Sequence, residues 1–338
     1  YDAMGRVITH TLPLNQSESF TYDVAGNVQT HTDFNGNTTA FIYDINHRVT
    51  QKTFSDGATE HYTYTATGQV ETASNGEGVT SYVYDAQDRL VSETKPTGEQ
   101  LAYGYDNNGN RTSVTVTAAN TTSETHHTFD ALNRLSSTTD QNGTTQYSYD
   151  AVGNRSAVIY PNAFAQRYSY DALNRLTTLT TQHNNLTTER YTYTLDASGK
   201  RTGMSELNGR NTTWVYDNLN RLTQETITQN NSSQNNTVHS ENYQYDAVGN
   251  RTYQTVNGVS TAYSYDANDQ LQNAGGISYS YDANGNTLTE NDAANNTYKT
   301  YSYNAKNELI AANDGNANAT FGYDINGIRN QKIEQNIT

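Results

Sequence analysis

The nonapeptide YSYDAVGNR at residues 147–155 contains the pattern that decides the fold of this 338-residue chain. Close variants are YSYDALNRL at 168–176, YQYDAVGNR at 243–251 and YGYDNNGNR at 103–111. The central Tyr-Asp dipeptide, here called the landmark, returns about every 21 residues, which predicts a repeat architecture. Sixteen landmark aromatics are found, at Tyr1, Tyr22, Tyr43, Tyr64, Tyr84, Tyr105, Phe129, Tyr149, Tyr170, Tyr193, Tyr216, Tyr245, Tyr265, Tyr281, Tyr303 and Tyr323.

A second aromatic residue stands two positions before nearly every landmark, as Tyr168 does before Tyr170. Residues at i and i+2 share one face of a β-strand and lie on different sides of a helix, so the segment is predicted to be a strand. We expect the rings to stack as a ladder along one face, from hairpin to hairpin. Truncating a buried tyrosine of such a ladder would cost about 3 to 5 kcal/mol.

Turn residues follow each landmark. The fourth residue after the landmark is Gly, Asn or Asp in every unit except those with His47 and Ala197. These residue types predict a backbone with positive φ at that position. The landmark Asp is suited to accept a hydrogen bond from an amide two residues later. Asn-Gly or Asp-Gly pairs such as Asn35-Gly36 and Asn142-Gly143 come 11 to 15 residues after many landmarks and indicate a second tight turn. Each unit is therefore predicted to be a β-hairpin.

About sixteen hairpins give an all-β fold of roughly 32 short antiparallel strands. A twisted sheet rarely exceeds about ten strands without curling, so the array is expected to coil into a spiral or a hollow shell. Residues 1–338 are predicted to be a single YD-repeat array without separate domains, and a segment of a larger protein. Longer units at Thr117 to His127, Gln182 to Thr188 and Gln229 to Asn242 are rich in Asn, Thr and Ser and are expected to be extended loops.

Composition excludes several classes of partner. The net charge of −15 argues against nucleic acid, which is bound through a surplus of Lys and Arg. No apolar run is long enough to insert into a membrane. The absence of cysteine rules out disulfides and thiol chemistry. Disorder is rejected because aromatic residues make up 11% of the chain and recur at a fixed period.

Ten of the fourteen arginines follow the landmark Asp by four or five residues. These are Arg6, Arg48, Arg89, Arg111, Arg134, Arg155, Arg175, Arg221, Arg251 and Arg329. A basic stripe for phosphates or acidic sugars is one interpretation. We favour the other, in which each arginine pairs with the Asp of its own turn or of the next hairpin.

No motif for chemistry emerges from the remaining polar residues. The D-x-x-G-N stretches, as in Asp106 to Asn110, lack the alternating ligands of a calcium loop. Of the eight histidines only His126 and His127 are adjacent, and neighbours in a strand point to opposite faces. No catalytic, cofactor or metal site is predicted, and the chain is not expected to be an enzyme. The residues singled out are a structural repeat signature: Tyr22, Asp23, Gly26, Tyr105, Asp106, Gly109, Arg111, Tyr149, Asp150, Gly153, Arg155, Tyr170, Asp171, Asn174, Arg175, Tyr216, Asp217, Arg221, Tyr245, Asp246, Gly249 and Arg251.

The four nonapeptides resemble the YD repeats of the Rhs family, which comprises bacterial Rhs polymorphic toxins, the B/C shells of insecticidal toxin complexes and animal teneurins. The resemblance implies β-hairpins wound into a hollow shell. In the toxins that shell encloses a C-terminal effector, and in teneurins it is an adhesion scaffold. One departure is that Leu12, Lys95 and Tyr160 precede the three prolines, so the Asp-Pro self-cleavage motif of toxin members does not occur.

Two functions follow from the repeats and the resemblance. The first is a non-enzymatic wall segment of a secreted shell that encapsulates a toxin effector, with the effector domain or neighbouring YD repeats as partners. The alternative is an extracellular or cell-surface adhesive scaffold, which forms fibres through unpaired edge strands and binds carbohydrate through its tyrosines.

Overall fold

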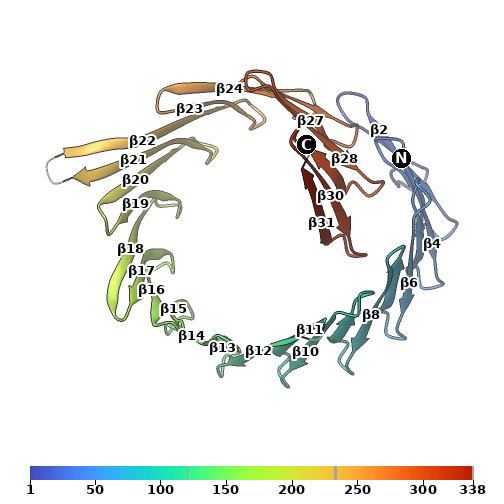
Figure 1. Ribbon diagram of the computed structural model, residues 1–338, viewed down its shortest axis with the longest axis horizontal. Helices are drawn as coiled ribbons and strands as arrows, with labels where there is room; N and C mark the ends of the chain where they lie inside the picture. Colours follow the sequence, from blue (N-terminus) through green and yellow to red (C-terminus); the bar gives the residue numbers. More distant parts are fainter. Residues whose placement is uncertain (120, 232–233, 337–338) are drawn as a thin grey trace. The chain divides into compact units, whose positions relative to one another are not determined.

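The computed structural model describes residues 1–119, 121–231 and 234–336. Over these residues the chain is all β, with 31 strands and no helix, and hence no helix that could cross a membrane (Figure 1). The predicted hairpin array is confirmed, with 31 strands in place of the expected 32 or so. The chain divides into two compact units: unit 1 comprises residues 1–99 and 262–338, and unit 2 comprises residues 100–261.

Unit 1 contains two runs of hairpins. The first run is β1 (Thr9–Thr11), β2 (Ser17–Tyr22), β3 (Val28–Thr32), β4 (Thr38–Tyr43), β5 (Val49–Thr53), β6 (Thr59–Tyr64), β7 (Val70–Asn75), β8 (Gly78–Tyr84) and β9 (Leu90–Thr94). The second run is β24 (Val259–Tyr265), β25 (Leu271–Ala274), β26 (Ile277–Tyr281), β27 (Thr287–Asp292), β28 (Thr297–Tyr303), β29 (Leu309–Asn313), β30 (Ala317–Tyr323) and β31 (Arg329–Asn336). The first residues of β24, up to Thr261, belong to unit 2.

Unit 2 is a single run. Its strands are β10 (Gln100–Tyr105), β11 (Arg111–Ala118), β12 (Thr121–Phe129), β13 (Leu135–Asp140), β14 (Gly143–Tyr149), β15 (Arg155–Ile159), β16 (Phe164–Tyr170), β17 (Leu176–His183), β18 (Leu186–Leu195), β19 (Arg201–Glu206), β20 (Arg210–Tyr216), β21 (Leu222–Asn231), β22 (Gln234–Tyr245) and β23 (Arg251–Val256).

Strands that follow one another within a run pair antiparallel, so successive turns alternate between the two edges of the sheet. The register shifts at the landmark, for example between Ser148 and Tyr149 where β14 pairs with β15. This bulge leads into the first turn, where the Gly153 amide donates to the Asp150 carbonyl at 3.2 Å. The landmark thus marks the end of a strand and the start of a tight turn.

The fourth residue after the landmark has the positive φ that the sequence predicts. The angle is +91° at Gly26, +98° at Gly153 and +108° at Gly249. His47, an exception in residue type, also has a φ of +63°. The turn therefore imposes this conformation even on a residue with a Cβ, at some steric cost.

One landmark was assigned wrongly. In the tenth unit the register shift falls between Thr194 and Leu195, so Leu195 occupies the landmark position and Tyr193 is the aromatic two residues before it. With this correction the fourth residue is Gly199, whose φ is +92°, and Ala197 is no exception. The prediction is wrong here because leucine replaces the aromatic residue of the pattern.

The expected extended loops are longer hairpins instead. The Thr- and Asn-rich stretches continue the ladder, with Thr117 opposite Thr122 and Gln182 opposite Thr187. Thr is β-branched and fits a pleated surface, while Asn184 and Asn185 have φ values of +50° and +64°, as a tight hairpin turn requires. The tips at residues 120 and 232–233 lie outside the described residues.

The aromatic face of the sheet is half-buried and the opposite face is exposed. In β2 the alternation is complete, with Glu18, Phe20 and Tyr22 partly covered and the residues between them exposed. Among the described residues, the fully buried hydrophobic side chains are few: Ala73, Ala157, Val158, Ile227 and Ile325. Stability in this thin sheet therefore depends strongly on hydrogen bonds, ion pairs and ring contacts.

Candidate functional site

The landmark tyrosines join consecutive hairpins. Their hydroxyl groups donate to a backbone carbonyl near the start of the preceding strand: Tyr22 to Val7 at 2.7 Å and Tyr43 to Val28 at 2.8 Å. The same link is made by Tyr64, Tyr84, Tyr149, Tyr170, Tyr216, Tyr245, Tyr281 and Tyr323. Each accepting carbonyl lies six residues after the previous landmark, so the link repeats with the period of the sequence.

Replacing Tyr43 by phenylalanine is expected to lower the free energy of unfolding by about 1 kcal/mol, because the change removes one hydrogen bond and keeps the ring. Urea denaturation followed by circular dichroism measures the loss. Tyr298→Phe is the matched control, since Tyr298 is 53% exposed. Equal stability of the two variants would contradict a stabilising role for the link.

Six arginines pair with the Asp of their own turn, as predicted. Arg175 is representative: its Nε lies 2.7 Å from Oδ2 of Asp171, and its Nη1 donates to the Asp196 carbonyl of the next turn at 3.0 Å. The other pairs are Arg6–Asp2, Arg48–Asp44, Arg89–Asp85, Arg134–Asp130 and Arg221–Asp217. In all six the arginine is four residues after the Asp. Where Asn holds that place, as at Asn27, Asn110 and Asn154, its amide donates to the Asp instead.

Three of the arginines that stand five residues after the Asp behave differently, and for these three the predicted pairing is wrong. Within the described chain, Arg111, Arg155 and Arg329 form no ion pair. Their guanidinium carbons lie over aromatic rings: Arg111 over Tyr103 at 5.4 Å, Arg155 over Tyr168 at 4.9 Å, Arg329 over Phe321 at 5.2 Å and Arg251 over Tyr243 at 5.9 Å. These arginines contact rings because each is the first residue of the next strand and lies on the aromatic face of the sheet.

These contacts also change the expected aromatic ladder. Direct ring stacking occurs at a few places, such as Phe20 with His31 at 4.6 Å and Phe164 with His183 at 4.4 Å. Cations over tyrosine faces are more frequent and include Arg6 over Tyr22 at 4.2 Å. The repeating contact is therefore largely between cation and ring, an interaction worth about 0.5 to 2 kcal/mol.

The landmark carboxylates are used inside their own turns. Oδ1 of Asp150 accepts the amides of Val152 and Asn154, and Oδ2 accepts the Asn154 side chain. Hydrogen bonds of this kind lower the pKa of Asp196, whose foremost donor is the Ser198 hydroxyl, to about 2. No cluster of three metal-ligating side chains is present in residues 1–119, 121–231 and 234–336.

The two adjacent histidines do not share a site. His126 is exposed and lies 3.4 Å from Glu124, whereas His127 is half-buried and bonded to Thr138 at 3.1 Å. Burial, followed by the charges of Arg111 and His126, lowers the pKa of His127. This arrangement provides no pair of groups converging on one substrate.

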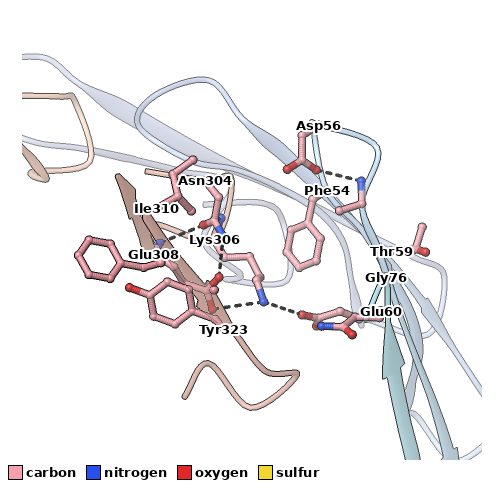
Figure 2. A pocket seen from close by; sticks show the side chains of 14 residues that line it. Phe54, Asp56, Thr59, Glu60, Gly76, Asn304, Lys306, Glu308, Ile310 and Tyr323 are labelled. Carbon is pink, nitrogen blue, oxygen red and sulfur yellow. Dashed lines mark hydrogen bonds and ion pairs between the residues drawn. The ribbon is translucent and has the colours of Figure 1, made fainter. Parts of the chain in front are cut away.

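A group of charged side chains lies in unit 1, where the second run meets the first. A cavity of about 270 Å³ is lined there by residues that include Phe54, Glu60, Lys306, Glu308 and Tyr323 (Figure 2). Glu60 is only 3% exposed, and its Oε1 lies 3.2 Å from the Lys306 ammonium. Lys306 also lies 3.2 Å from Glu308, so it bridges the two runs.

Two further groups complete the surroundings of Glu60. Oε2 of Glu60 accepts from the Tyr62 hydroxyl at 2.7 Å and from the Lys52 ammonium at 3.0 Å. Burial by itself would raise the pKa of Glu60, but these donors together with Lys306 hold the pKa below its usual value. Glu60 is therefore an ionised, fully engaged carboxylate that links three other side chains.

The same boundary between the two runs, here called the seam, contains repeated contacts at one turn position. In four consecutive units of the second run, the third residue after the landmark reaches the first run: Asn268, Asn284, Lys306 and Asn326. Two partners lie in second turns, where Asn268 donates to Gln16 at 3.0 Å and Asn284 to Asp33 at 2.7 Å. Asn326 donates to the hydroxyl of Tyr82, which lies within β8, at 3.1 Å. The seam therefore joins the first-turn edge of one run to the second-turn edge of the other.

A second buried ion group closes the seam at its far end. The Lys95 ammonium lies 2.7 Å from Asp324 and 2.8 Å from Glu93. Burial acts to lower the pKa of Lys95, but the two carboxylates outweigh it and raise that pKa. Sequence reasoning missed both ion groups, because each joins residues of the two runs that are about 230 to 250 residues apart in the chain, Lys95 with Asp324 and Glu60 with Lys306.

Alkaline pH is expected to unfold the protein cooperatively. Burial, and then the Glu241 carboxylate, raises the pKa of Tyr243 to about 12, and burial likewise raises the pKa of Tyr43, Tyr64 and Tyr84. The unfolded chain ionises first, near pH 10, so this stability is complete below pH 10 and is lost as the pH rises through 12. Tyrosinate absorbance and circular dichroism should therefore change together. Full ionisation near pH 10 with the sheet intact would contradict the expectation.

Comparisons with known proteins agree with this geometry. A family model described as the RHS repeat matches residues 1–39, 84–122 and 129–165. No curated protein matches the chain. The crystal structure of TcdB2-TccC3-TEV is similar over 99% of this chain at 15% identity and a TM-score of 0.55, and that of TcdB2-TccC3 without its hypervariable C-terminal region over 95% at 15% identity and 0.51.

The likeness to these structures concerns the fold, since the identity is low. This chain covers 22% of each of the two matched chains. The chain therefore contains RHS (YD) repeats in the three matched segments, and its hairpin period and fold are similar beyond them.

Proposed function

We propose that the chain is a non-enzymatic wall segment of a secreted RHS-type β-shell that encloses a toxin effector, with residues 1–338 acting as one uninterrupted array. The observation that carries the proposal is the seam. There the second run of unit 1 is bonded to the first run at intervals of one hairpin, from Asn268 to Asn326. A strip that bonds to itself edge to edge forms a continuous wall, which enclosure requires.

The chemistry of the side chains supports a wall and not a catalyst. Landmark carboxylates are occupied by turn amides, and the buried Glu60 is bonded to two ammonium groups and a phenol. We expect the purified chain to be inert toward polysaccharides, peptides and nucleic acids in a hydrolase screen. Turnover that disappears on replacing His126 and His127 by alanine would overturn this part of the proposal.

The partners follow from the proposed wall. They are the effector domain and the neighbouring YD repeats of the full-length protein, outside the cell. A test uses the full reading frame that contains residues 1–338, with its effector retained. The effector should resist protease in the intact protein and be cleaved faster when the seam is opened by Asn284→Arg with Asn326→Arg. Asn46→Arg, at the same turn position but exposed and away from the seam, is the matched control.

Two outcomes of this experiment would contradict enclosure. One is an effector in the intact protein that is cleaved as fast as the isolated effector. The other is a seam variant, folded by circular dichroism, that protects its effector as well as the Asn46→Arg control does.

A further inference from the structure

One landmark carboxylate lacks the partner that the others have. In every other unit with a landmark Asp, the fourth residue after the Asp is Arg, Asn, Lys or Gln. The residue four positions after Asp324 is Ile328, whose side chain is 62% exposed. Oδ1 of Asp324 still serves the turn, because it accepts the amides of Asn326 at 2.9 Å and Ile328 at 3.0 Å. Within the turn at residues 324–328, Oδ2 has no partner.

Lys95 of the first run takes the place of that partner across the seam. Its ammonium nitrogen lies 2.7 Å from Oδ2 of Asp324 and 2.8 Å from Oε1 of Glu93. The three side chains are largely buried, with 17% of the surface exposed for Lys95, 10% for Asp324 and 13% for Glu93. Ile325 beside Asp324 is buried, and Tyr82 lies opposite Glu93 where β8 pairs with β9. A primary amine is thus held against a carboxyl group at a site that excludes most water.

Two further features of this group are suited to the formation of an amide. The backbone amides that donate to Oδ1 of Asp324 polarise the carboxyl carbon and would stabilise the negative charge that develops on Oδ1 during attack. Oε1 of Glu93 is buried and takes part in no hydrogen bond with the described residues, so it has a lone pair free to receive a proton from Nζ of Lys95. Holding the two reacting groups in contact also replaces a slow encounter by a very high effective concentration.

We propose that Lys95 and Asp324 form an intramolecular isopeptide bond that closes the seam covalently, with Glu93 as the proton carrier. The Nζ–Cγ bond forms and the Cγ–Oδ2 bond breaks. One ammonium proton passes through Glu93 to Oδ2, a second follows from the attacking nitrogen by the same route, and Oδ2 leaves as water. The amide keeps one hydrogen on Nζ, Glu93 returns to its carboxylate form, and no other reactant is needed.

The ion pair governs the rate of this reaction, and burial governs its equilibrium. Two carboxylates hold Lys95 as an ammonium ion, so the attacking amine is the minor form and the bond should form slowly, over hours after folding. Exchanging a buried ion pair for a neutral amide removes the desolvation cost of two charges, and the exclusion of water opposes hydrolysis. The bond would join residues 229 positions apart and does not depend on what the wall encloses.

The other ion group of the seam is not expected to react. Glu60 is shared by the ammonium groups of Lys52 and Lys306 and by the Tyr62 hydroxyl. The second positive charge keeps this carboxylate ionised, which is the form that resists attack by an amine. The Lys306 group therefore provides a matched control within the same seam.

Peptide mapping of the chain, expressed within its full reading frame, tests the bond. Trypsin does not cut between Lys95 and Pro96, so Lys95 lies in peptide 90–111, and Asp324 lies in peptide 307–329. In the wild type we expect the two peptides as one branched species, lighter by one water than their sum. Fragment ions should place the link at Lys95 and Asp324, which separates it from a succinimide at an Asp-Gly pair, since that product also loses one water.

Three variants separate the covalent bond from the ion pair. Lys95→Arg keeps the positive charge but has no nucleophilic amine, so the two peptides should appear unlinked. Glu93→Gln keeps the shape of the side chain and removes the proton carrier, so the link should form about a hundredfold more slowly than in the wild type. Lys306→Arg is the control and should be linked at the wild-type rate.

Three outcomes would overturn the proposal, in proteins that circular dichroism shows to be folded. The first is a wild type whose two peptides remain mainly unlinked days after purification. The second is a Glu93→Gln variant that is linked as fast as the wild type. The third is a branched species that persists in Lys95→Arg, which would place the bond at another residue.

Discussion

Replacing Glu60 by alanine is expected to destabilise unit 1 by about 3 to 5 kcal/mol, because the change leaves buried ammonium groups without their carboxylate. Glu60 is 3% exposed and lies within 3.2 Å of Lys52, Lys306 and the Tyr62 hydroxyl. The alanine variant keeps the two lysines at the seam and removes the group that neutralises them. Urea denaturation should show this loss, and protease should cut unit 1 sooner than unit 2, since damage in repeat arrays stays near its origin.

Two comparisons separate this effect from the loss of any glutamate. Glu71→Ala, at an exposed position of β7, should change stability by no more than about 0.5 kcal/mol. The triple variant Glu60→Leu, Lys52→Met and Lys306→Met replaces the buried charges by apolar groups and should recover most of the lost stability. Equal stability of Glu60→Ala and Glu71→Ala would contradict the role assigned to Glu60.

The repeating turn could be predicted from the sequence because its determinants are local. The residues that build it lie within nine positions, as in Tyr149, Asp150 and Gly153, and they recur often enough to define the pattern. The same local view failed where the residue type departed from the pattern although the backbone did not. His47 and Leu195 hold the conformations of their positions through the neighbouring turn and strand geometry.

The seam could not be predicted, because no periodicity relates its partners. Lys306 stands 246 residues after Glu60, and their contact depends on the twist of all the strands between them. A small change in strand twist, summed over many strands, would bring different residues together. What the sequence does contain is a choice of residue at one turn position: asparagine or lysine along the seam, and an aliphatic residue in five of the seven hairpins of unit 2.

Gly143→Ala is expected to destabilise unit 2 by about 2 to 5 kcal/mol, because the substitution causes both backbone strain and a steric clash. Gly143 begins β14 with a φ of +120°, a conformation that residues with a Cβ rarely adopt. A Cβ at this position would also lie 2.7 Å from Cβ of Pro161, in the second turn of the next hairpin. Proline cannot rotate its ring away, so the contact can be relieved only by separating the hairpins.

Gly36→Ala isolates the backbone part of this cost. Gly36 has a φ of +82° and a Cβ there would meet nothing within 4 Å, so about 1 to 2 kcal/mol is expected. In the Gly143→Ala background, Pro161→Ala should give little relief because Cβ is retained, whereas Pro161→Gly should relieve the clash. Equal losses for Gly143→Ala and Gly36→Ala would show that the hairpins can part freely. The larger loss is expected because the strands that carry these two second turns, β14 and β15, are held together by their backbone ladder from Gln146 opposite Ile159 to Tyr149 opposite Arg155.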